Sequence, residues 1–263
     1  MTRISTTIYY FSATGNTLSI ARRMAQSMEA PLIPMTQGVK TPCASERIGL
    51  LFPIYFWGLP RTAVHFIRGL PIVCPNPYIF AIATCGGFPG GALGMAENLL
   101  NQRGLRLSYG TAIPSVANFI EEYNPRSKSA AARIRRADDM AQKAAGEILC
   151  KAENQIPRFS LKDRIFYGIY EHFKLDQDEG FRADGRCTGC GVCARVCPSG
   201  NISLKQGKPE FHHRCEHCTA CIHWCPQKAL QWKRATVKRR RYHHPDIRLE
   251  DIVIPGEREK KEV

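Results

Sequence analysis

Apolar positions in the first part of the chain follow two alternating patterns. Short runs of apolar, β-branched and aromatic residues stand at 5–11, 47–55, 78–87 and 105–113. After each of them, apolar residues recur every three or four positions, as on one face of a helix, at 16–28, 61–70, 91–104 and 134–148. Runs that are apolar throughout are typical of strands buried on both sides in a parallel sheet. The pattern predicts an α/β fold with a doubly wound parallel five-stranded sheet, and these runs locate four of its strands.

Residues 155–180 join this part to the next. Ser160 and Asp163 have the spacing of a helix N-cap. The apolar positions after them are Ile165, Ile169 and Phe173 on one face, flanked by Phe166 and Tyr170. A linker that only provided reach would be polar. We therefore expect this helix to dock the two parts on each other; the alternative is a helix that covers only the core of the first part.

Two stretches of the second part place cysteines at the same spacing. CTGCGVCARVCP spans 187–198 and CEHCTACIHWCP spans 215–226, so the chain repeats this pattern once. Disulfide frameworks belong to short secreted chains, whereas this chain is long and opens without the segments of a secretion signal. We therefore expect a reducing, cytoplasmic location. Zinc sites use cysteines in pairs, and a third cysteine at this spacing exceeds what a tetrahedral zinc needs.

The spacing C-x2-C-x2-C suits three corners of an iron–sulfur cube, and the cysteine before the proline reaches a second cube. The sequence therefore predicts two interlocked [4Fe-4S] clusters. The expected ligands are Cys187, Cys190, Cys193 and Cys225 for one cluster, and Cys215, Cys218, Cys221 and Cys197 for the other. Pro198 and Pro226 have no N–H and a fixed φ, so each turns the chain as it leaves a cluster.

The segment 181–232 resembles the bacterial ferredoxins with two [4Fe-4S] clusters, and all eight ligand positions match. The resemblance implies a small α+β domain. Between the motifs, ISLKQGKPEF at 202–211 predicts a hairpin with Gln206-Gly207 and Lys208-Pro209 at its turn. The cysteines expected to be buried thiols rather than ligands are Cys43, Cys74, Cys85 and Cys150. The histidines expected to form hydrogen bonds or to face solvent are His212, His213, His217 and His223.

The carboxyl ends of the predicted strands hold the candidate binding residues of the first part. A loop follows the first strand just before a helix N-terminus, where backbone N–H groups and hydroxyls can surround a phosphate. Its residues are Ser12, Ala13, Thr14, Gly15, Asn16 and Thr17. It has neither the lysine of a Walker A loop nor the G-x-G-x-x-G of dinucleotide sites. The alternative is an ordinary helix N-cap.

Two further loops lie at the carboxyl ends of the strands predicted at 47–55 and 78–87, which are the third and fourth of the five. One carries three consecutive aromatics, which cannot all face one core, and the other has glycines that let the backbone approach a flat ring. Their residues are Pro53, Tyr55, Phe56, Trp57 and Gly58, and Thr84, Cys85, Gly86, Gly87 and Phe88. With the phosphate loop they describe an FMN site, and residues 4 to about 150 resemble a flavodoxin. The resemblance implies that the two loops enclose the isoalloxazine and that the Gly86-Gly87 backbone contacts its N5 edge.

The whole chain resembles the EFR-type flavodoxin–ferredoxin fusion family of anaerobes. The matching stretches are FPIYFWGLPRTAVHFIRGL at 52–70, ATCGGFPGGAL at 83–93, both cysteine motifs and RYHHPDI at 241–247. The expected organisation is a flavodoxin-like FMN-binding domain at 1–154, a connecting helix at 155–180, a ferredoxin domain at 181–232 and a basic extension at 233–263. The resemblance implies an electron-transfer flavoprotein with FMN and two [4Fe-4S] clusters, and no catalytic residue is assigned.

The chain is basic, because 37 Lys and Arg residues against 23 Asp and Glu residues give a formal net charge of +14. Two clusters and an FMN phosphate at about −2 each leave roughly +8 for the loaded protein. Six of the cations lie in KRATVKRRR at 233–241. We expect this run to meet an acidic redox partner, such as a ferredoxin or the docking face of an oxidoreductase. The alternatives are a solvated tail and an anionic membrane surface.

Two other functions stay open at this point. One is an enzyme in which the reduced flavin delivers electrons to a small molecule. The other is a redox-regulated protein that binds nucleic acid through the basic run, although the sequence offers no recognition fold for it. The sequence also holds no apolar run long enough for a transmembrane helix.

Overall fold

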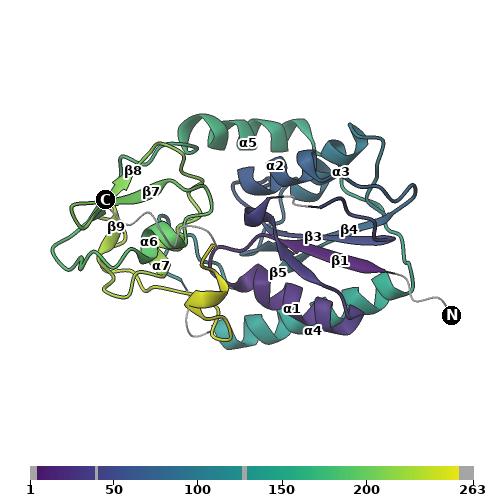
Figure 1. Ribbon diagram of the computed structural model, residues 1–263, viewed down its shortest axis with the longest axis horizontal. Helices are drawn as coiled ribbons and strands as arrows, with labels where there is room; N and C mark the ends of the chain where they lie inside the picture. Colours follow the sequence, from purple (N-terminus) through teal and green to yellow (C-terminus); the bar gives the residue numbers. More distant parts are fainter. Residues whose placement is uncertain (1–4, 39–40, 126–128, 255–263) are drawn as a thin grey trace. The chain divides into compact units, whose positions relative to one another are not determined.

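The computed structural model describes residues 5–38, 41–125 and 129–254 (Figure 1). The chain forms two compact units. Of the described residues, the first unit holds 5–12, 16–117 and 129–170, and the second holds 13–15, 118–125 and 171–254. The short segments 13–15 and 118–125 were expected in the first domain, so the division of the chain differs from the predicted boundaries.

A five-stranded sheet forms the centre of the first unit. Its strands are β1 (Thr6–Tyr10), β2 (Leu32–Pro34), β3 (Arg47–Pro53), β4 (Tyr78–Cys85) and β5 (Tyr109–Pro114). They lie in the order β2-β1-β3-β4-β5, and every neighbouring pair is parallel. This is the flavodoxin-like strand order, whose switch point lies between β1 and β3. The predicted fold class of this unit is confirmed.

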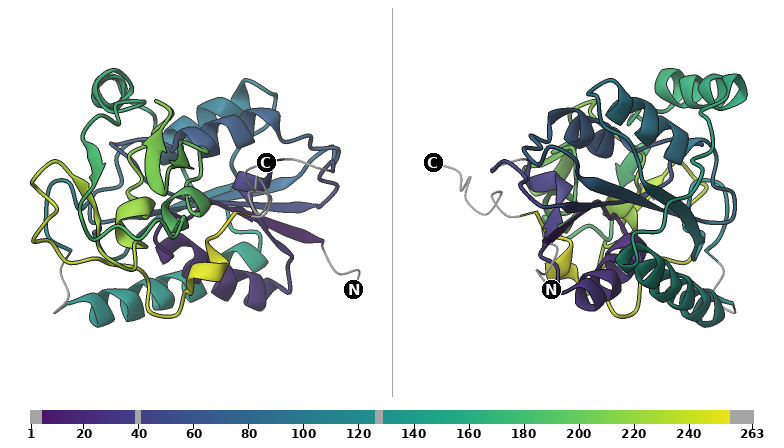
Figure 2. Two further views of the ribbon diagram at one scale, coloured as in Figure 1. Left: turned by 60° about the vertical axis from the view of Figure 1, so that its left-hand side comes forward. Right: turned by 90° about the vertical axis from the view of Figure 1, so that its right-hand side faces the viewer.

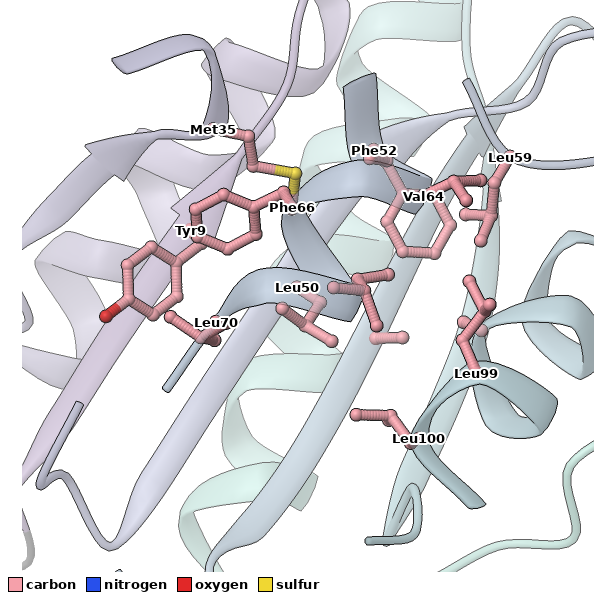
Figure 3. Close-up of a cluster of buried hydrophobic side chains, with 14 of the residues drawn as sticks. Tyr9, Met35, Leu50, Phe52, Leu59, Val64, Phe66, Leu70, Leu99 and Leu100 are labelled. Atoms are coloured by element: carbon pink, nitrogen blue, oxygen red, sulfur yellow. The ribbon is translucent and has the colours of Figure 1, made fainter. Parts of the chain in front are cut away.

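Two pairs of helices cover the two faces of the sheet. α1 (Asn16–Met28) and α4 (Ala130–Leu149) pack on one face, and α2 (Arg61–Gly69) and α3 (Ala92–Asn101) pack on the other, as the views of Figure 2 show. Figure 3 shows the core under α2 and α3. Its labelled members are Tyr9, Met35, Leu50, Phe52, Leu59, Val64, Phe66, Leu70, Leu99 and Leu100.

Successive residues of the central strands serve these two cores in turn. On β3, Leu50 and Phe52 belong to the core under α2 and α3, whereas Leu51 belongs to the core under α1 and α4. A Cβ at Gly49 would overlap the Phe80 ring, so the glycine leaves room for that ring. With both faces covered by helices, the carboxyl ends of β1, β3 and β4 are the places where sheets of this kind bind ligands.

Helix α5 (Leu161–Phe173) begins at the predicted cap. The Asp163 N–H donates to the Ser160 hydroxyl (3.2 Å), and the Ser160 N–H donates to the Asp163 carboxylate (3.0 Å). This reciprocal capping pair satisfies two backbone donors that a helix start leaves without intrahelical partners.

The buried side of α5 is aromatic. Tyr167 and Tyr170 are 5% and 1% exposed, whereas Ile165, Ile169 and Phe173 are 56%, 48% and 65% exposed. The expectation that the face of Ile165, Ile169 and Phe173 is the packing face is therefore wrong. Apolar residues stand on both sides of this helix, so helical periodicity alone does not select the buried one.

The second unit contains two small antiparallel strand pairs and two short helices. β6 (Phe181–Ala183) pairs with β9 (Leu230–Trp232), and β7 (Ile202–Lys205) pairs with β8 (Lys208–Phe211). α6 (Val192–Arg195) and α7 (Ala220–His223) lie within the first and the second cysteine motif. The predicted hairpin at 202–211 is present, but only Gln206 and Gly207 form its turn, since Lys208 and Pro209 already pair in β8.

The repeat seen in the cysteines extends to the fold of this unit. α6 and α7 start at equivalent positions of the two repeats, Val192 and Ala220, and so do β7 and β9, at Ile202 and Leu230. Ile202 and Leu230 are 4% and 2% exposed and belong to one core with Phe181. The two halves of the segment therefore fold alike around a shared core.

The described part of the C-terminal extension is folded into the second unit. Thr236 is fully buried, and its hydroxyl accepts from the Trp232 N–H (2.8 Å) and donates to Gln231 (2.9 Å). The Arg241 guanidinium donates to the Leu230 carbonyl (3.0 Å) and to Gln231 (2.9 Å). The expected boundary at 232 and the solvated-tail alternative are therefore wrong for 233–254, and 255–263 lie outside the described residues. Within the described part, no helix has the length and apolar character needed to cross a membrane.

Candidate functional site

Four cysteines line one cavity in the second unit. Cys215, Cys218 and Cys221 come from the second motif, and Cys197 comes from the first. The other lining residues are Phe181, Ser199, Asn201, Ile202, Phe211, Glu216 and Thr219. The four side chains expected around one cluster thus meet at one place, including the ligand expected to cross over from the other motif.

The other expected set is grouped around Cys193. The pKa of its thiol is raised to about 11, first by burial and further by the neighbouring Cys190, Cys225 and Cys187. Cys225 comes from the other motif, so this group also combines cysteines of both motifs. The N–H of Ala194 acts in the opposite sense and lowers the pKa of Cys193.

The chemistry of both sets fits iron–sulfur clusters. Burial raises the pKa of Cys215, Cys218 and Cys221, and the nearby Cys197 raises each of them further. Thiols buried in this way become thiolates only where cations compensate their charge. Among the described residues, no three His, Cys, Asp and Glu side chains gather closely enough to hold one metal ion. A four-iron cube does not need such a gathering, because each of its cysteines binds a different iron.

Backbone N–H groups point at three of these sulfurs. Asn201 donates to the Cys197 sulfur (3.2 Å), and Ala229, at the equivalent position of the second repeat, donates to the Cys225 sulfur (3.3 Å). His217 donates to the Cys215 sulfur (3.3 Å). Such bonds stabilise the thiolate form and are one of the terms that set the potential of a cluster.

Residues with a left-handed backbone recur in matched pairs through the two motifs. The pairs, each at equivalent positions of the two repeats, are Gly189 (φ 71°) with His217 (φ 52°), Gly191 (φ 73°) with Thr219 (φ 56°) and Gly200 (φ 57°) with Lys228 (φ 50°). Left-handed residues between right-handed ones direct successive N–H groups inward and form a nest for an anion. The first motif meets this demand with glycine, whereas the second uses residues with a side chain.

His217 is fixed in place by a buried polar group that the sequence did not reveal. Its ring nitrogens lie 2.7 Å from a carboxylate oxygen of Glu121 and 2.6 Å from the carbonyl oxygen of Gln177. Lys174 pairs with the other oxygen of Glu121 (3.1 Å).

Burial lowers the pKa of His223 to about 4, so that ring stays neutral. The expectation that these two histidines form hydrogen bonds is confirmed.

In the first unit, the start of α1 is tied to neighbouring strand ends. The Thr17 hydroxyl lies 2.7 Å from the hydroxyl of Thr84, near the end of β4. The Asn16 side-chain amide donates to the Val116 carbonyl (3.0 Å) after β5. Two residues of the expected phosphate loop and one of the expected glycine loop are therefore brought together.

Residues 13–15 of the expected phosphate loop belong to the second unit. The Trp224 indole N–H donates to the Ala13 carbonyl (2.9 Å), and the His244 N–H donates to the Thr14 carbonyl (2.8 Å). A Cβ at Gly15 (φ 98°) would lie 2.9 Å from the Cβ of His244. Within this unit, part of the stretch RYHHPDI therefore packs directly on 13–15, which sequence periodicity gave no means to predict.

The aromatic loop forms a tight turn at the end of β3. Tyr55 and Gly58 exchange two backbone hydrogen bonds (3.0 and 2.9 Å), and Phe56 (φ 42°) and Trp57 (φ 70°) are left-handed between them. The Trp57 side chain stacks on Phe166 of α5, and its indole N–H is buried with no hydrogen-bond partner among the described residues. A buried donor without a partner costs about 1–3 kcal/mol, a cost that the ring contacts of Trp57 must offset.

The glycine loop follows β4 and is open to solvent. Gly86, Gly87 and Phe88 are exposed, whereas Cys85 is buried and its pKa is raised by burial. Arg133 of α4, a residue that sequence reasoning missed, donates to the Gly86 carbonyl (3.1 Å). The loop expected at the N5 edge of the ring is thus held by a cation from another element.

The four cysteines outside the motifs differ in exposure. Cys43 and Cys85 are buried, as expected, and Cys74 is half-buried. Cys150 is exposed at the end of α4, so the expectation of burial is wrong for this residue.

Comparison with known proteins supports the iron–sulfur interpretation of the cysteine-rich segment. Residues 186–230, which include all eight expected ligands, match the family described as 4Fe-4S dicluster domain. The iron–sulfur character of this segment is thereby confirmed, and with it a role in electron transfer. A subunit of the ion-translocating oxidoreductase complex of Methanosarcina acetivorans is 39% identical over 46 residues. That stretch is 17% of this chain and 17% of the relative, so the chain spans only a small part of that protein.

Several solved structures are similar to the chain at low identity. The rubredoxin:oxygen oxidoreductase of Desulfovibrio gigas is 17% identical over 56% of this chain and 36% of its own, with a TM-score of 0.37. A flavodoxin of Streptococcus pneumoniae is 14% identical over 54% of this chain and 98% of its own, with a TM-score of 0.37. A flavodoxin of Fusobacterium nucleatum, bound to flavin mononucleotide, is 11% identical over 54% and 98%, with a TM-score of 0.36. The fold assignment rests on the strand order of the sheet itself, because scores this low add nothing to it.

Proposed function

We propose that this protein is an electron carrier that passes electrons between an FMN and two [4Fe-4S] clusters and exchanges them with partner proteins. The observation that carries the proposal is the cavity lined by Cys197 together with Cys215, Cys218 and Cys221. Three sequential cysteines and one from the other motif are the donor set that a cube in a two-cluster ferredoxin requires. The reciprocal group of Cys193 and Cys225 supports a second cluster.

The strand order supports FMN as the second cofactor. β1, β3 and β4 are neighbours in the sheet, and ligands of doubly wound folds bind beyond the carboxyl ends at the switch point between β1 and β3. In this proposal the residues that hold the phosphate are Ser12, Ala13, Thr14, Gly15, Asn16 and Thr17. Those that hold the ring are Pro53, Tyr55, Phe56, Trp57 and Gly58, with Thr84, Cys85, Gly86, Gly87 and Phe88.

The residues present fit this group. The loop before α1 offers hydroxyls at a helix N-terminus, and Trp57 offers a flat, partly exposed aromatic surface. When bound, a flavin takes up one or two electrons and a cluster passes one at a time, so the pair links two-electron to one-electron chemistry. The chain's own part is to hold both cofactors and to exclude water from the buried thiolates.

Anaerobic purification tests this proposal directly. The protein is expected to contain about eight iron, eight labile sulfide and one FMN per chain. Zinc in place of iron, or about two iron per chain, would overturn the cluster assignment, and the absence of bound or bindable FMN would overturn the flavin assignment. Steady turnover of quinones, nitro compounds or enoates by the reduced protein would favour the alternative, a flavin-dependent reductase.

A further inference from the structure

The aromatic loop at the end of β3 has a backbone conformation that residues with side chains rarely adopt. Phe56 and Trp57 are both left-handed, with φ of 42° and 70°. Such a conformation is strained for a residue with a side chain and persists only where the surroundings impose it. Stacked ring contacts to this turn come from the connecting helix α5 (Leu161–Phe173), and the Gly91 N–H donates to the Trp57 carbonyl (2.8 Å).

Three aromatic residues of α5 contact the loop. The Phe166 ring stacks on Trp57, with centroids 4.7 Å apart and planes at 17°. The Tyr170 ring stacks on Phe56 in the same way, at 4.6 Å and 8°. A stacked aromatic pair gains stability beyond the burial of its area, so the two pairs offset part of the strain.

Tyr167 anchors the end of the same loop. Its hydroxyl donates to the Leu59 carbonyl (2.9 Å). Its ring occupies the space that a side chain at Gly58 would need, because a Cβ there would overlap the ring. The loop and the helix are therefore fitted to each other over four successive residues, 56–59.

The Trp57 indole also contacts the neighbouring glycine loop. Phe166 covers one face, and Phe88 of the neighbouring glycine loop meets the indole at 61° and 5.9 Å, as an edge contact. Phe88 belongs to the other loop expected at the ring, so the indole joins α5 to both loops of the proposed site. The indole N–H is buried with no hydrogen-bond partner among the described residues, so the partly exposed ring, rather than the N–H, is the part that a flat ligand can meet.

We propose that α5 is the backing wall of the flavin site, with Phe166 and Tyr170 as positioning residues. They hold Trp57 and Phe56 in the left-handed turn that places the indole beside the isoalloxazine. The inference rests on the proposed FMN site. It gives the connecting helix a role in cofactor binding in addition to that of a linker.

The experiment measures FMN affinity in the full chain after removal of flavin, by the quenching of flavin fluorescence. Phe166→Ala and Tyr170→Ala are each expected to weaken FMN binding about 3- to 10-fold, from the loss of one stacked pair. Ile169→Ala is the matched control, because Ile169 lies on the same helix and is 48% exposed. Phe166→Tyr keeps the stacked ring and is expected to bind FMN as tightly as the wild type. The thermal midpoint of each variant is measured in parallel, because a residue that serves only the fold would lower the midpoint of the flavin-free protein without a separate loss of FMN affinity.

The outcomes separate this inference from the function on which it rests. If the wild type binds FMN tightly and Phe166→Ala, Tyr170→Ala and Ile169→Ala bind it equally well, α5 is not part of the site and the inference is wrong, while the FMN proposal stands. Tighter FMN binding by Phe166→Ala would overturn it as well, because α5 would then compete with the flavin. A wild type without FMN affinity would overturn both.

Discussion

The guanidinium of Arg133 donates a hydrogen bond to the carbonyl of Gly86, at 3.1 Å, across 47 residues of sequence. The same nitrogen also lies 3.3 Å from the Ser115 carbonyl. One cation on α4 thus joins the loops that follow β4 and β5. Because the Gly86-Gly87 backbone is the segment proposed at the N5 edge of the flavin, Arg133 limits the conformations that this segment adopts.

Replacement of Arg133 tests this restraint. Arg133→Ala frees two carbonyls, and a hydrogen bond is worth about 0.5–1.5 kcal/mol net, so FMN binding is expected to weaken about 2- to 10-fold. Iron and sulfide content should not change. The control is Arg136→Ala, which removes the same charge from an exposed position of the same helix. Equal FMN affinity of the two variants would show that Arg133 does not act on the flavin site.

The crossed ligation is tested by combining cysteine replacements. In the proposed arrangement, Cys225 serves the cluster of Cys187, although it belongs to the motif of Cys215. The double variant Cys187→Ser/Cys225→Ser should therefore lose one cluster and keep about four iron per chain. The double variant Cys215→Ser/Cys225→Ser should damage both clusters.

Iron analysis and electron paramagnetic resonance of the reduced protein distinguish these results. The reciprocal pair gives a second check, since Cys215→Ser/Cys197→Ser should also lose a single cluster. If the iron content instead falls least when both replaced cysteines come from the same motif, each motif holds its own cluster and the crossing is wrong.

Two glycines of the first motif form a matched pair for a stability measurement. Gly189 and Gly191 are both left-handed, with φ of 71° and 73°. A Cβ at Gly189 would lie 2.7 Å from the Gly207 carbonyl oxygen, whereas a Cβ at Gly191 would meet only a Leu204 methyl group at 3.5 Å. Gly191→Ala should therefore cost only the strain of the backbone, about 1–2 kcal/mol.

Gly189→Ala should cost more, because a backbone carbonyl must also move. The check is the thermal midpoint of the iron-loaded protein, with cluster content measured in parallel. Equal midpoints for the two variants would mean that the contact with Gly207 relaxes without cost, and that the strained backbone alone determines the effect.

The parts of this fold that sequence predicts are those with a local or repeating signal. The buried strands β1, β3, β4 and β5 are visible in the sequence as apolar runs. β2 has only three residues, Leu32–Pro34, all half-buried, so it forms no apolar run that could be recognised. The repeated cysteine motif predicts the grouping of Cys197 with Cys215, because the rule for such motifs states which cysteine crosses over.

Contacts between distant segments leave no such signal. The pair of Glu121 and His217 joins residues 96 apart, and nothing near either residue indicates the other. The basic run illustrates the same limit. Its composition predicts exposed cations, but the Arg239 guanidinium donates to the Ile120 carbonyl (2.6 Å), which only the folded second unit reveals. A residue type thus indicates what a side chain can do, while the partner it finds depends on the tertiary fold.

These contacts divide the basic run into anchored and exposed cations. Arg239 and Arg241 donate to backbone carbonyls and serve the fold of the second unit. Lys233, Arg234 and Lys238 are exposed. Arg240 is exposed too, but its backbone N–H donates to the Asn124 side chain (2.9 Å), so it is left out of the second group. A docking site for an acidic partner, which we propose here, should therefore involve the second group, and charge reversal of the first group would confuse docking with folding.

The last prediction concerns this docking site. Reversal of the three exposed charges, by Lys233→Glu, Arg234→Glu and Lys238→Glu, should slow electron transfer from an acidic ferredoxin about tenfold or more at low salt, because complementary fields raise on-rates. The salt dependence of the rate should also become flatter, since exposed charges are screened beyond about 8 Å at physiological ionic strength. Stopped-flow rates over a salt series provide the measurement.

The control changes the net charge by the same amount elsewhere on the chain. Arg135, Arg136 and Lys143 are exposed positions of α4, and their replacement by glutamate removes three positive charges and adds three negative ones, as in the test variant. Internal transfer between the cofactors should be unchanged in both, because it needs no encounter between proteins. If the two triple variants slow the reaction equally, the partner responds to the total charge rather than to this surface, and the docking site lies elsewhere.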